Sequence, residues 1–252
     1  MAPMKTSRTD ETPYSGVDTI ALNHAMSEFC DCADSALNCR KLSLLDTQHA
    51  DRPYVEAFVQ KVFFKAYQAK LDTFYPLLLS ISARADTDDG AYAAVAGVRP
   101  AGGEPLFLEH YLDQPIEDVL AVERHKIIEI GNLAPANAGQ ARWLITTLNA
   151  FMLGAGFTHV VFTAVPHLKN AFSRMGLPLT ELAEAHGDSL TIEEKANWGS
   201  YYEANPKVFV GDLRVGEGPL TEISKMDPYL DELCQHATRA GEEYLSTSGN
   251  HH

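Results

Sequence analysis

Glu129 is the residue most clearly suited to acid–base chemistry, because it lies between Ile128 and Ile130 in a stretch that otherwise has the composition of a buried strand. A buried carboxylate is costly unless it has a partner or takes up a proton. Arg99, at the end of another apolar segment, is the candidate partner. Two hypotheses stay open: Glu129 is a general base with a raised pKa, or it is one half of a structural ion pair.

The segment after Glu129 has residues suited to binding an anion. Residues 135–141 read Pro-Ala-Asn-Ala-Gly-Gln-Ala and precede a predicted helix. A helix N-terminus presents unpaired N–H donors and a partial positive charge, so it can bind a pyrophosphate without a lysine. Gly139 has no side chain to keep a bulky anion from the backbone. The alternative is that these small residues only form a tight connection between a strand and a helix.

Asn132 and a group of aromatic residues are further candidates for binding. Asn132 follows Gly131 where the predicted strand breaks. Its amide can donate to a carbonyl and accept from an amine, or it can bond to its own backbone as a turn residue. Trp198, Tyr201 and Tyr202 combine apolar area with polar edges, which suits a substrate pocket and also suits core packing.

Residues 109–111 combine polar and aromatic groups in a segment that we expect at a sheet edge or in a loop. Glu109 and Trp198 are predicted to contact the substrate. His110 is either a proton shuttle or an ordinary surface histidine.

Apolar periodicity predicts the elements that must position these residues. Intervals of three and four between Val55 and Leu71 predict an amphipathic helix that ends near Pro76. Apolar runs on either side of an Asp- and Gly-rich turn predict an antiparallel hairpin. The other predicted elements follow in chain order: hairpin strands 77–83 and 91–99, a helical stretch 115–122, a strand 127–130, a helix 140–153, a strand 158–164, a short helix 168–175, strands 179–185 and 208–213, and a helix 228–244.

Strand, helix and strand within residues 127–164 predict a βαβ unit with parallel strands, and hence an α/β fold. We divide the chain into an N-terminal extension (1–51), partly disordered because it is polar, a main domain (52–215), and a C-terminal helix and tail (216–252).

Charge and cysteine content exclude several functions. Thirty-four acidic and 20 basic residues give a formal charge of -14 without a Lys/Arg cluster, which argues against nucleic acid as a partner. The four cysteines lack the paired spacing of a zinc site, so we expect free thiols and no metal. No long uncharged apolar run and no secretory-type N-terminus occur, so we expect a cytoplasmic protein without stable membrane insertion.

The order of elements, with Gly139, Ala141 and Asn170, resembles GNAT-type acyltransferases. Their pyrophosphate loop has Gln or Arg, two residues, Gly, one residue, and then Gly or Ala; here Ala136 replaces the Gln or Arg. The resemblance implies a mixed, mostly antiparallel central sheet with helices on both faces, and a site for acyl-CoA or acyl-carrier protein. It places this donor on Leu133, Ala134, Asn137, Ala138, Gly139, Gln140, Ala141 and Asn170.

Longer runs resemble the thermostable hemolysin family. They are residues 106–113, 128–134, 162–164 with Leu168 and Asn170, and 198–202. The family name records a phenotype, and the resemblance implies kinship with GNAT enzymes and acyl-homoserine lactone synthases. The lactone synthases carry a strand-borne Arg and then a Glu and an Arg three residues apart. Arg99 and Glu129 resemble the first two, and Asn132 stands in place of the second Arg.

The resemblance also assigns catalytic roles. Glu129 becomes the base that deprotonates an amine, directly or through a water, and Asn132 donates to a thioester carbonyl. Many GNAT enzymes have a general-acid Tyr where this chain has Phe172, which cannot protonate a leaving thiolate. That role would fall to Tyr201, Tyr202 or Ser173.

The leading hypothesis is an N-acyltransferase that moves an acyl group from acyl-CoA or acyl-carrier protein to the amine of a small molecule. One alternative is a synthase that uses S-adenosylmethionine, as in the lactone synthases, although Asn132 lacks the cation expected there. The other is a non-enzymatic, membrane-active hemolysin, although the sequence has no basic amphipathic helix.

Overall fold

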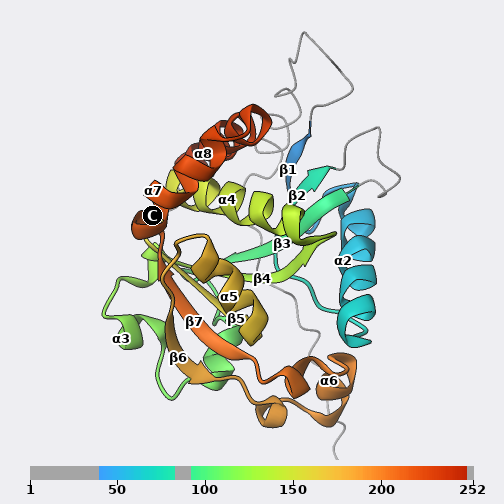
Figure 1. Cartoon of the computed structure of the whole chain (residues 1–252). Coiled ribbons are helices and arrows are strands. Elements are labelled where there is room, and N and C mark those ends of the chain that lie inside the picture. Colours follow the sequence, from blue (N-terminus) through green and yellow to red (C-terminus); the bar gives the residue numbers. More distant parts are fainter. Residues whose placement is uncertain (1–39, 83–91, 249–252) are drawn as a thin grey trace, which may run out of the picture.

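The computed structural model describes residues 40–82 and 92–248. In that part of the chain, helices cover both faces of a seven-stranded sheet (Figure 1). The strand order is β1-β2-β3-β4-β5-β7-β6, and every neighbouring pair is antiparallel except β4 and β5. The expected mixed, mostly antiparallel sheet is therefore confirmed.

The bounds of the elements show how closely the pattern of apolar residues predicts the structure. The strands are β1 (Leu42–Leu45), β2 (Leu77–Ser82), β3 (Tyr92–Pro100), β4 (Ile127–Pro135), β5 (His159–Ala164), β6 (Thr180–Glu184) and β7 (Lys207–Asp212). The helices are α2 (Arg52–Tyr67), α3 (Ile116–Leu120), α4 (Ala138–Gly154), α5 (Pro166–Arg174), α6 (Ile192–Asn197), α7 (Leu213–Lys225) and α8 (Pro228–Ser248). Short 3-10 turns include η1 (Phe107–Tyr111) and η4 (Tyr201–Ala204).

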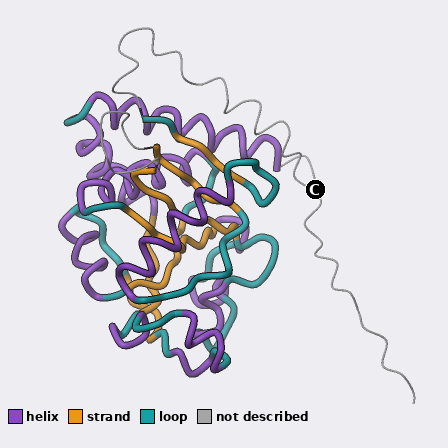
Figure 2. Tube along the Cα trace, turned by 90° about the vertical axis from the view of Figure 1, so that its right-hand side faces the viewer, coloured by secondary structure: helices purple, strands orange, loops and turns teal. Residues whose placement is uncertain are grey.

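Alternation along the strands assigns each face of the sheet to its own helices. Figure 2 shows the strands from the side with helices around them. Leu79 of β2 and Ala96 of β3 pack in the cluster that contains α4, α7 and α8. Leu78 and Val95, one position away, pack in the cluster that contains α2. Successive side chains of a strand point to opposite faces, so α2 and α4 cover opposite faces.

The predicted hairpin and βαβ unit are confirmed, since β2 pairs antiparallel with β3 and β4 runs parallel to β5 on either side of α4. The first helix, however, ends at Tyr67 and not near Pro76, so that part of the prediction is wrong. Gln68 adopts a left-handed conformation with φ of 56° and donates its N–H to the carbonyl of Phe64. The next residues leave the helix, and Lys70 donates its N–H to the carbonyl of Asn197.

Two differences concern the ends of the domain. Leu42–Leu45, which the sequence division places in the N-terminal extension, pairs with β2 as an edge strand of the sheet. Beyond β7, the chain continues into α7, a helix that the sequence pattern did not predict. The predicted disorder of residues 1–39 falls outside the described residues. In the described ranges, no helix has the length and apolar character needed to cross a membrane.

Candidate functional site

The candidate site begins where β4 and β5 separate. Their parallel pairing ends at Ile130 and Phe162, but β4 continues to Pro135 on its β3 side and β5 continues to Ala164 on its β7 side. A bulge in β4 accompanies the separation, because Gly97 pairs with Gly131 whereas Val95 pairs with Ala134. The predicted break in the strand is thus a bulge, and it leaves β4 and β5 unpaired with each other beyond Ile130.

Asn132 occupies the bulge. Its φ of 47° is left-handed, a conformation that Asn tolerates better than most residues. Its side-chain Oδ1 accepts the backbone N–H of Tyr75 at 3.0 Å, so it joins β4 to the connection between α2 and β2. The Asn132 side chain therefore bonds to the backbone of a distant residue and not to its own.

A cavity of about 690 Å³ lies at the separated strands. Its lining includes residues 130–133 of β4. It also includes residues 162–164 at the end of β5 and Val165, which follows that strand. Aromatic residues from α2, η1 and the segment around η4 also line it, and they include Tyr67, Phe107, Tyr111, Trp198, Tyr201 and Tyr202. Its size is in the range of small-molecule sites.

Tyr75 lines this cavity, and the sequence pattern indicated no functional role for it. Its backbone N–H bonds to Asn132, its hydroxyl interacts with the carboxylate of Glu129, and the guanidinium carbon of Arg99 lies 4.7 Å from the centre of its ring. Burial, followed by the charge of Glu129, raises the pKa of Tyr75. The only sequence signal was a tyrosine before Pro76, a pattern that indicates a helix end and no chemistry.

Glu129 interacts with Tyr75 and is only 1% exposed. Its two carboxylate oxygens accept the backbone N–H groups of Phe107, at 3.0 Å, and Leu108, at 2.9 Å. Arg99 is its cross-strand neighbour. Burial raises the pKa of Glu129, while the Leu108 N–H and then the Arg99 charge oppose the rise. The predicted pairing with Arg99 is therefore an electrostatic contact across β3 and β4.

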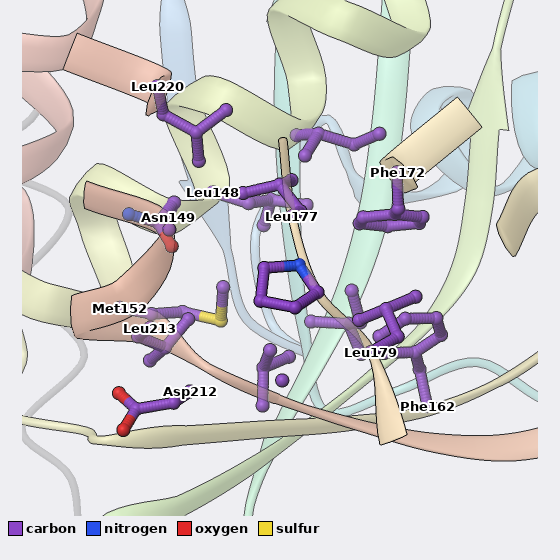
Figure 3. Close-up of a pocket in the computed structure, with 16 residues that line it drawn as sticks. Leu148, Asn149, Met152, Phe162, Phe172, Leu177, Leu179, Asp212, Leu213 and Leu220 are labelled. Atoms are coloured by element: carbon purple, nitrogen blue, oxygen red, sulfur yellow. The ribbon is translucent and has the colours of Figure 1, made fainter. Parts of the chain in front are cut away.

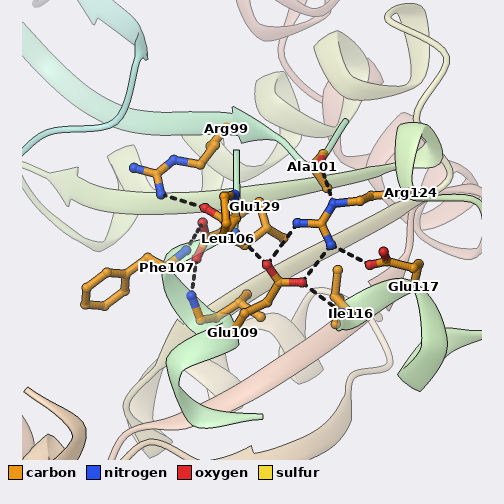
Figure 4. Close-up of polar contacts among 11 residues, drawn as sticks. Arg99, Ala101, Leu106, Phe107, Glu109, Ile116, Glu117, Arg124 and Glu129 are labelled. Carbon is orange, nitrogen blue, oxygen red and sulfur yellow. Dashed lines mark hydrogen bonds and ion pairs between the residues drawn. The ribbon is translucent and has the colours of Figure 1, made fainter. Parts of the chain in front are cut away.

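Glu109 has a different environment from the one predicted. It is not among the residues that line the cavity; it pairs instead with Arg124, with Oε1 2.7 Å from Nη1 and Oε2 2.9 Å from Nη2 (Figure 4). It also accepts the backbone N–H groups of Leu106 and Ile116. These bonds, led by the one from Arg124, lower its pKa to about 2. Glu109 therefore fixes η1 and the start of α3.

Hydrogen bonds hold the aromatic residues of the cavity in place. One joins two tyrosine hydroxyls, and another joins a tyrosine hydroxyl to a backbone carbonyl of β5. The hydroxyls of Tyr111 and Tyr202 lie 2.6 Å apart, and the hydroxyl of Tyr201 donates to the carbonyl of Thr163 at 3.3 Å. Trp198 packs against Tyr201 with ring centres 5.1 Å apart. Trp198, Tyr201 and Tyr202 therefore line the cavity and also pack against one another.

The N-terminus of α4 follows β4 after two residues. Asn137 caps it by accepting the N–H of Gln140 at 3.1 Å. A Cβ at Gly139 would lie 3.3 Å from this capping oxygen, so the turn has little space for a side chain there. The side chain of Gln140 accepts from Arg40 at 2.7 Å, which places a cation at this helix end.

A second, smaller cavity of about 40 Å³ lies on the α4 face of the sheet (Figure 3). Leu148, Met152, Leu177 and Leu213 contribute apolar walls. Ile130, Phe162 and Phe172 line both cavities, and the rings of Phe162 and Phe172 stack with centres 5.0 Å apart. We call these two rings, which border both cavities, the partition.

Of the candidate residues, the structure brings Arg99, Asn132, Leu133, Trp198, Tyr201 and Tyr202 to the wall of one cavity. Ala134 is buried on the α2 face, and Asn170 and Ser173 are exposed on α5 away from the cavity lining. Within the described ranges, no cluster of His, Cys, Asp and Glu could hold a metal ion, and Cys234 is a free thiol. Cys30, Cys32 and Cys39 lie outside those ranges.

The mixed, mostly antiparallel sheet and the parallel strands β4 and β5 on either side of α4 agree with the fold that the sequence predicts. The family model described as "Thermostable hemolysin" matches residues 45–217, and the chain belongs to this family. No curated protein matches the chain.

Solved structures with a similar fold include FeeM, an N-acyl amino acid synthase from uncultured soil microbes. It has a TM-score of 0.51 and 12% identity, with 75% of this chain and 99% of that chain covered. TofI in an apo form has the same TM-score, identity and coverage. MesI, a CoA-dependent acyl-homoserine lactone synthase, has a TM-score of 0.49 and 11% identity, with 74% and 96% covered. At 12% identity, the likeness to FeeM and TofI shows the fold alone.

Proposed function

We propose that this protein is an N-acyltransferase that moves an acyl group from acyl-CoA or acyl-carrier protein to the amine of a small molecule. The observation that carries the proposal is the separation of β4 and β5 beyond Ile130 and Phe162, next to a cavity of about 690 Å³. An extended, polar arm such as pantetheine can hydrogen-bond to the backbone that β5 leaves unpaired on β4.

The donor would lie along β4 in this proposal. A diphosphate would bind at residues 137–141, where α4 begins, because a helix N-terminus attracts negative charge. Arg40, which bonds to Gln140, adds a positive charge at the same place. Leu133, Ala134 and Asn170 remain proposed contacts of the pantetheine arm.

The amine would attack the thioester at the bulge. Direct attack needs positioning, carbonyl polarisation and removal of a proton from the nitrogen. The Nδ2 group of Asn132 is the proposed donor to the carbonyl, because Oδ1 already accepts from Tyr75. Arg99 and Glu129 supply charge at the same point, and Trp198, Tyr201 and Tyr202 are the proposed wall of the acceptor site. FeeM, which shares the fold, is an N-acyl amino acid synthase, and this supports the same reaction class.

The test is transfer itself. Purified protein would be incubated with acyl-CoA and acyl-carrier protein of several chain lengths and a mixture of small amines. Release of free thiol, with an amide product identified by mass spectrometry, is the expected result. Heat-denatured protein gives the blank for uncatalysed aminolysis, and Gly131→Ala, whose added Cβ would lie 2.5 Å from Cζ of Tyr75, gives a matched variant with reduced transfer.

Two outcomes would contradict the proposal. Calorimetric binding of S-adenosylmethionine with no binding of any acyl donor would favour the alternative synthase. Leakage of liposomes caused by the protein alone, without donor or amine and with no amide formed, would favour a membrane-active hemolysin.

A further inference from the structure

The position of Glu129 raises a chemical problem for amine deprotonation. Its carboxylate is 1% exposed, and it is not among the described residues that line the cavity. Both of its oxygens accept backbone N–H groups, from Phe107 and Leu108. An amine in the cavity therefore cannot reach Glu129 without another group between them.

Tyr75 is that intervening group. It lines the cavity, and its hydroxyl interacts with the carboxylate of Glu129. A phenolic oxygen that donates its hydrogen to a carboxylate keeps lone pairs that can accept a hydrogen from an amine. The side chain thus connects the cavity to a buried carboxylate through a single oxygen atom.

The fold holds the Tyr75 ring in a slot formed by two glycines. Gly97 and Gly131 are paired across β3 and β4. A Cβ at Gly97 would lie 2.7 Å from Cβ of Tyr75, and a Cβ at Gly131 would lie 2.7 Å from its hydroxyl oxygen. Arg99 lies over the ring, and Asn132 holds the backbone N–H of Tyr75. The hydroxyl is therefore fixed beside Gly131, where β4 leaves β5.

We propose that Tyr75 is a catalytic residue that passes a proton from the acceptor amine to Glu129; this inference rests on the proposed acyl transfer. The neutral amine attacks the thioester carbonyl carbon, and a C–N bond forms. The nitrogen then loses one proton to the Tyr75 oxygen while the Tyr75 hydroxyl proton moves to Glu129. The C–S bond breaks, its electron pair leaves on sulfur, and the proton on Glu129 returns through Tyr75 to the thiolate. Thioester and amine become amide and thiol, and Tyr75 and Glu129 end as they began.

The environment of the pair favours a relay over a free phenolate. Burial raises the pKa of Tyr75, so a tyrosinate formed alone in this site is costly. Burial also raises the pKa of Glu129, which makes its carboxylate a better proton acceptor than an exposed one. In the relay Tyr75 gives up one proton as it gains another and stays neutral.

The first experiment is Tyr75→Phe, which keeps the ring in its slot and removes the oxygen. We expect kcat to fall about 10²- to 10⁴-fold, the usual contribution of general acid–base catalysis, with KM for the acyl donor unchanged. Tyr92→Phe is the matched control, because Tyr92 is on β3 outside the cavity and packs against Phe58. A kcat within about threefold of the unmodified protein, or a loss confined to KM, would overturn the relay.

The second experiment needs no variant and so does not depend on the folding of one. Single-turnover acyl transfer by the unmodified protein is measured in mixtures of H2O and D2O. Two protons moving together give a curved dependence of rate on deuterium fraction, and a purely structural Tyr75 would not. A linear dependence overturns the relay. If the unmodified protein transfers acyl groups to no amine, the proposed function has failed; if it does transfer them and Tyr75→Phe is fully active, only the relay has failed.

Discussion

At the residue scale, the site depends on two glycines, which have no side chain, as much as on the polar and aromatic residues around them. Gly97 and Gly131 leave the space that the Tyr75 ring fills, and Asn132 supplies the left-handed backbone of the bulge. The three residues lie on two paired strands, so a small change at any one of them moves the ring relative to Glu129.

Gly131→Ala tests this dependence. The added Cβ would lie 2.5 Å from Cζ of Tyr75, a separation that forces the ring to move. We expect acyl transfer to fall at least tenfold, because small misplacements at a reacting centre cost large factors in rate. The measurement is kcat with circular dichroism as a check of folding. Gly102→Ala is the control, since its Cβ would meet only ordinary contacts near His125 at 3.8 Å; equal activity of the two variants would contradict the slot.

Glu109→Gln tests a carboxylate that holds η1 in place. The folded pKa of about 2 is below the ordinary 4.5, so the ionised form stabilises the fold above pH 4.5 and this contribution is lost as pH falls toward 2. The side chain is 15% exposed, and after allowance for solvent screening we expect about 2 kcal/mol at pH 7. Urea unfolding should show Glu109→Gln less stable at pH 7, with the difference shrinking below pH 4.5. Exposed Glu104→Gln is the control; a difference that stays constant with pH would exclude the Arg124 pair as its cause.

At the scale of elements, β4 and α4 together form the proposed donor site. The strand provides unpaired backbone on its β5 side, and two residues later the helix presents its N-terminus. The capping oxygen of Asn137 leaves little room at Gly139, so a side chain there would project away from it, toward the position proposed for the diphosphate.

Gly139→Asp should separate the diphosphate site from the rest of the donor site. A carboxylate at this position suits the helix dipole but repels a diphosphate. We expect KM for acyl-CoA to rise about tenfold, the effect of about 1.4 kcal/mol, while an acyl-pantetheine donor without the diphosphate is used as before. Steady-state kinetics with both donors is the measurement. An equal rise in KM for both donors would place the diphosphate elsewhere.

The partition formed by Phe162 and Phe172 should limit the length of the acyl chain. If the chain runs toward these rings, Phe172→Leu opens a path between the two cavities, and kcat/KM for long-chain donors should rise roughly tenfold relative to short-chain donors. Phe151→Leu is the matched control, because Phe151 is buried in the same core cluster but lines neither cavity. An unchanged chain-length profile in Phe172→Leu would show that the acyl chain lies elsewhere.

At the scale of the whole molecule, local pattern predicted the hairpin, the βαβ unit and the family, because these depend on periodicity and turn residues in short segments. It did not predict Tyr75, since the slot is formed by glycines 22 and 56 residues further along the chain (97 less 75, and 131 less 75). Nor did it predict the partner of Glu109: Arg124 is brought to it by the turn at α3. Both failures concern contacts that only tertiary packing creates.

The C-terminal helix α8 packs against the central sheet and α4. Leu233, Ala237 and Ala240 of α8 belong to the same core cluster as β3, β4 and α4, so α8 is part of the main body (Figure 1). Two glycines allow a close approach: a Cβ at Gly154 of α4 would lie 2.3 Å from the carbonyl oxygen of Thr238, and a Cβ at Gly241 of α8 would lie 2.2 Å from that of Phe151. The helix whose N-terminus is the proposed diphosphate site therefore packs closely against α8.

Gly241→Ala tests whether this close packing stabilises the whole domain. Alanine is the better helix former by roughly 0.5–1 kcal/mol, but its methyl group would overlap backbone that cannot rotate away. Overpacking of this kind typically costs about 1–3 kcal/mol, so we expect a net loss in the free energy of unfolding, measured by urea denaturation with one cooperative transition. Glu242→Ala, at the adjacent exposed position, should stay within about 0.5 kcal/mol. A separate unfolding transition of α8 at lower urea would show that α8 unfolds independently of the domain. A single transition shifted to lower urea would show that α8 unfolds together with the fold that holds the site.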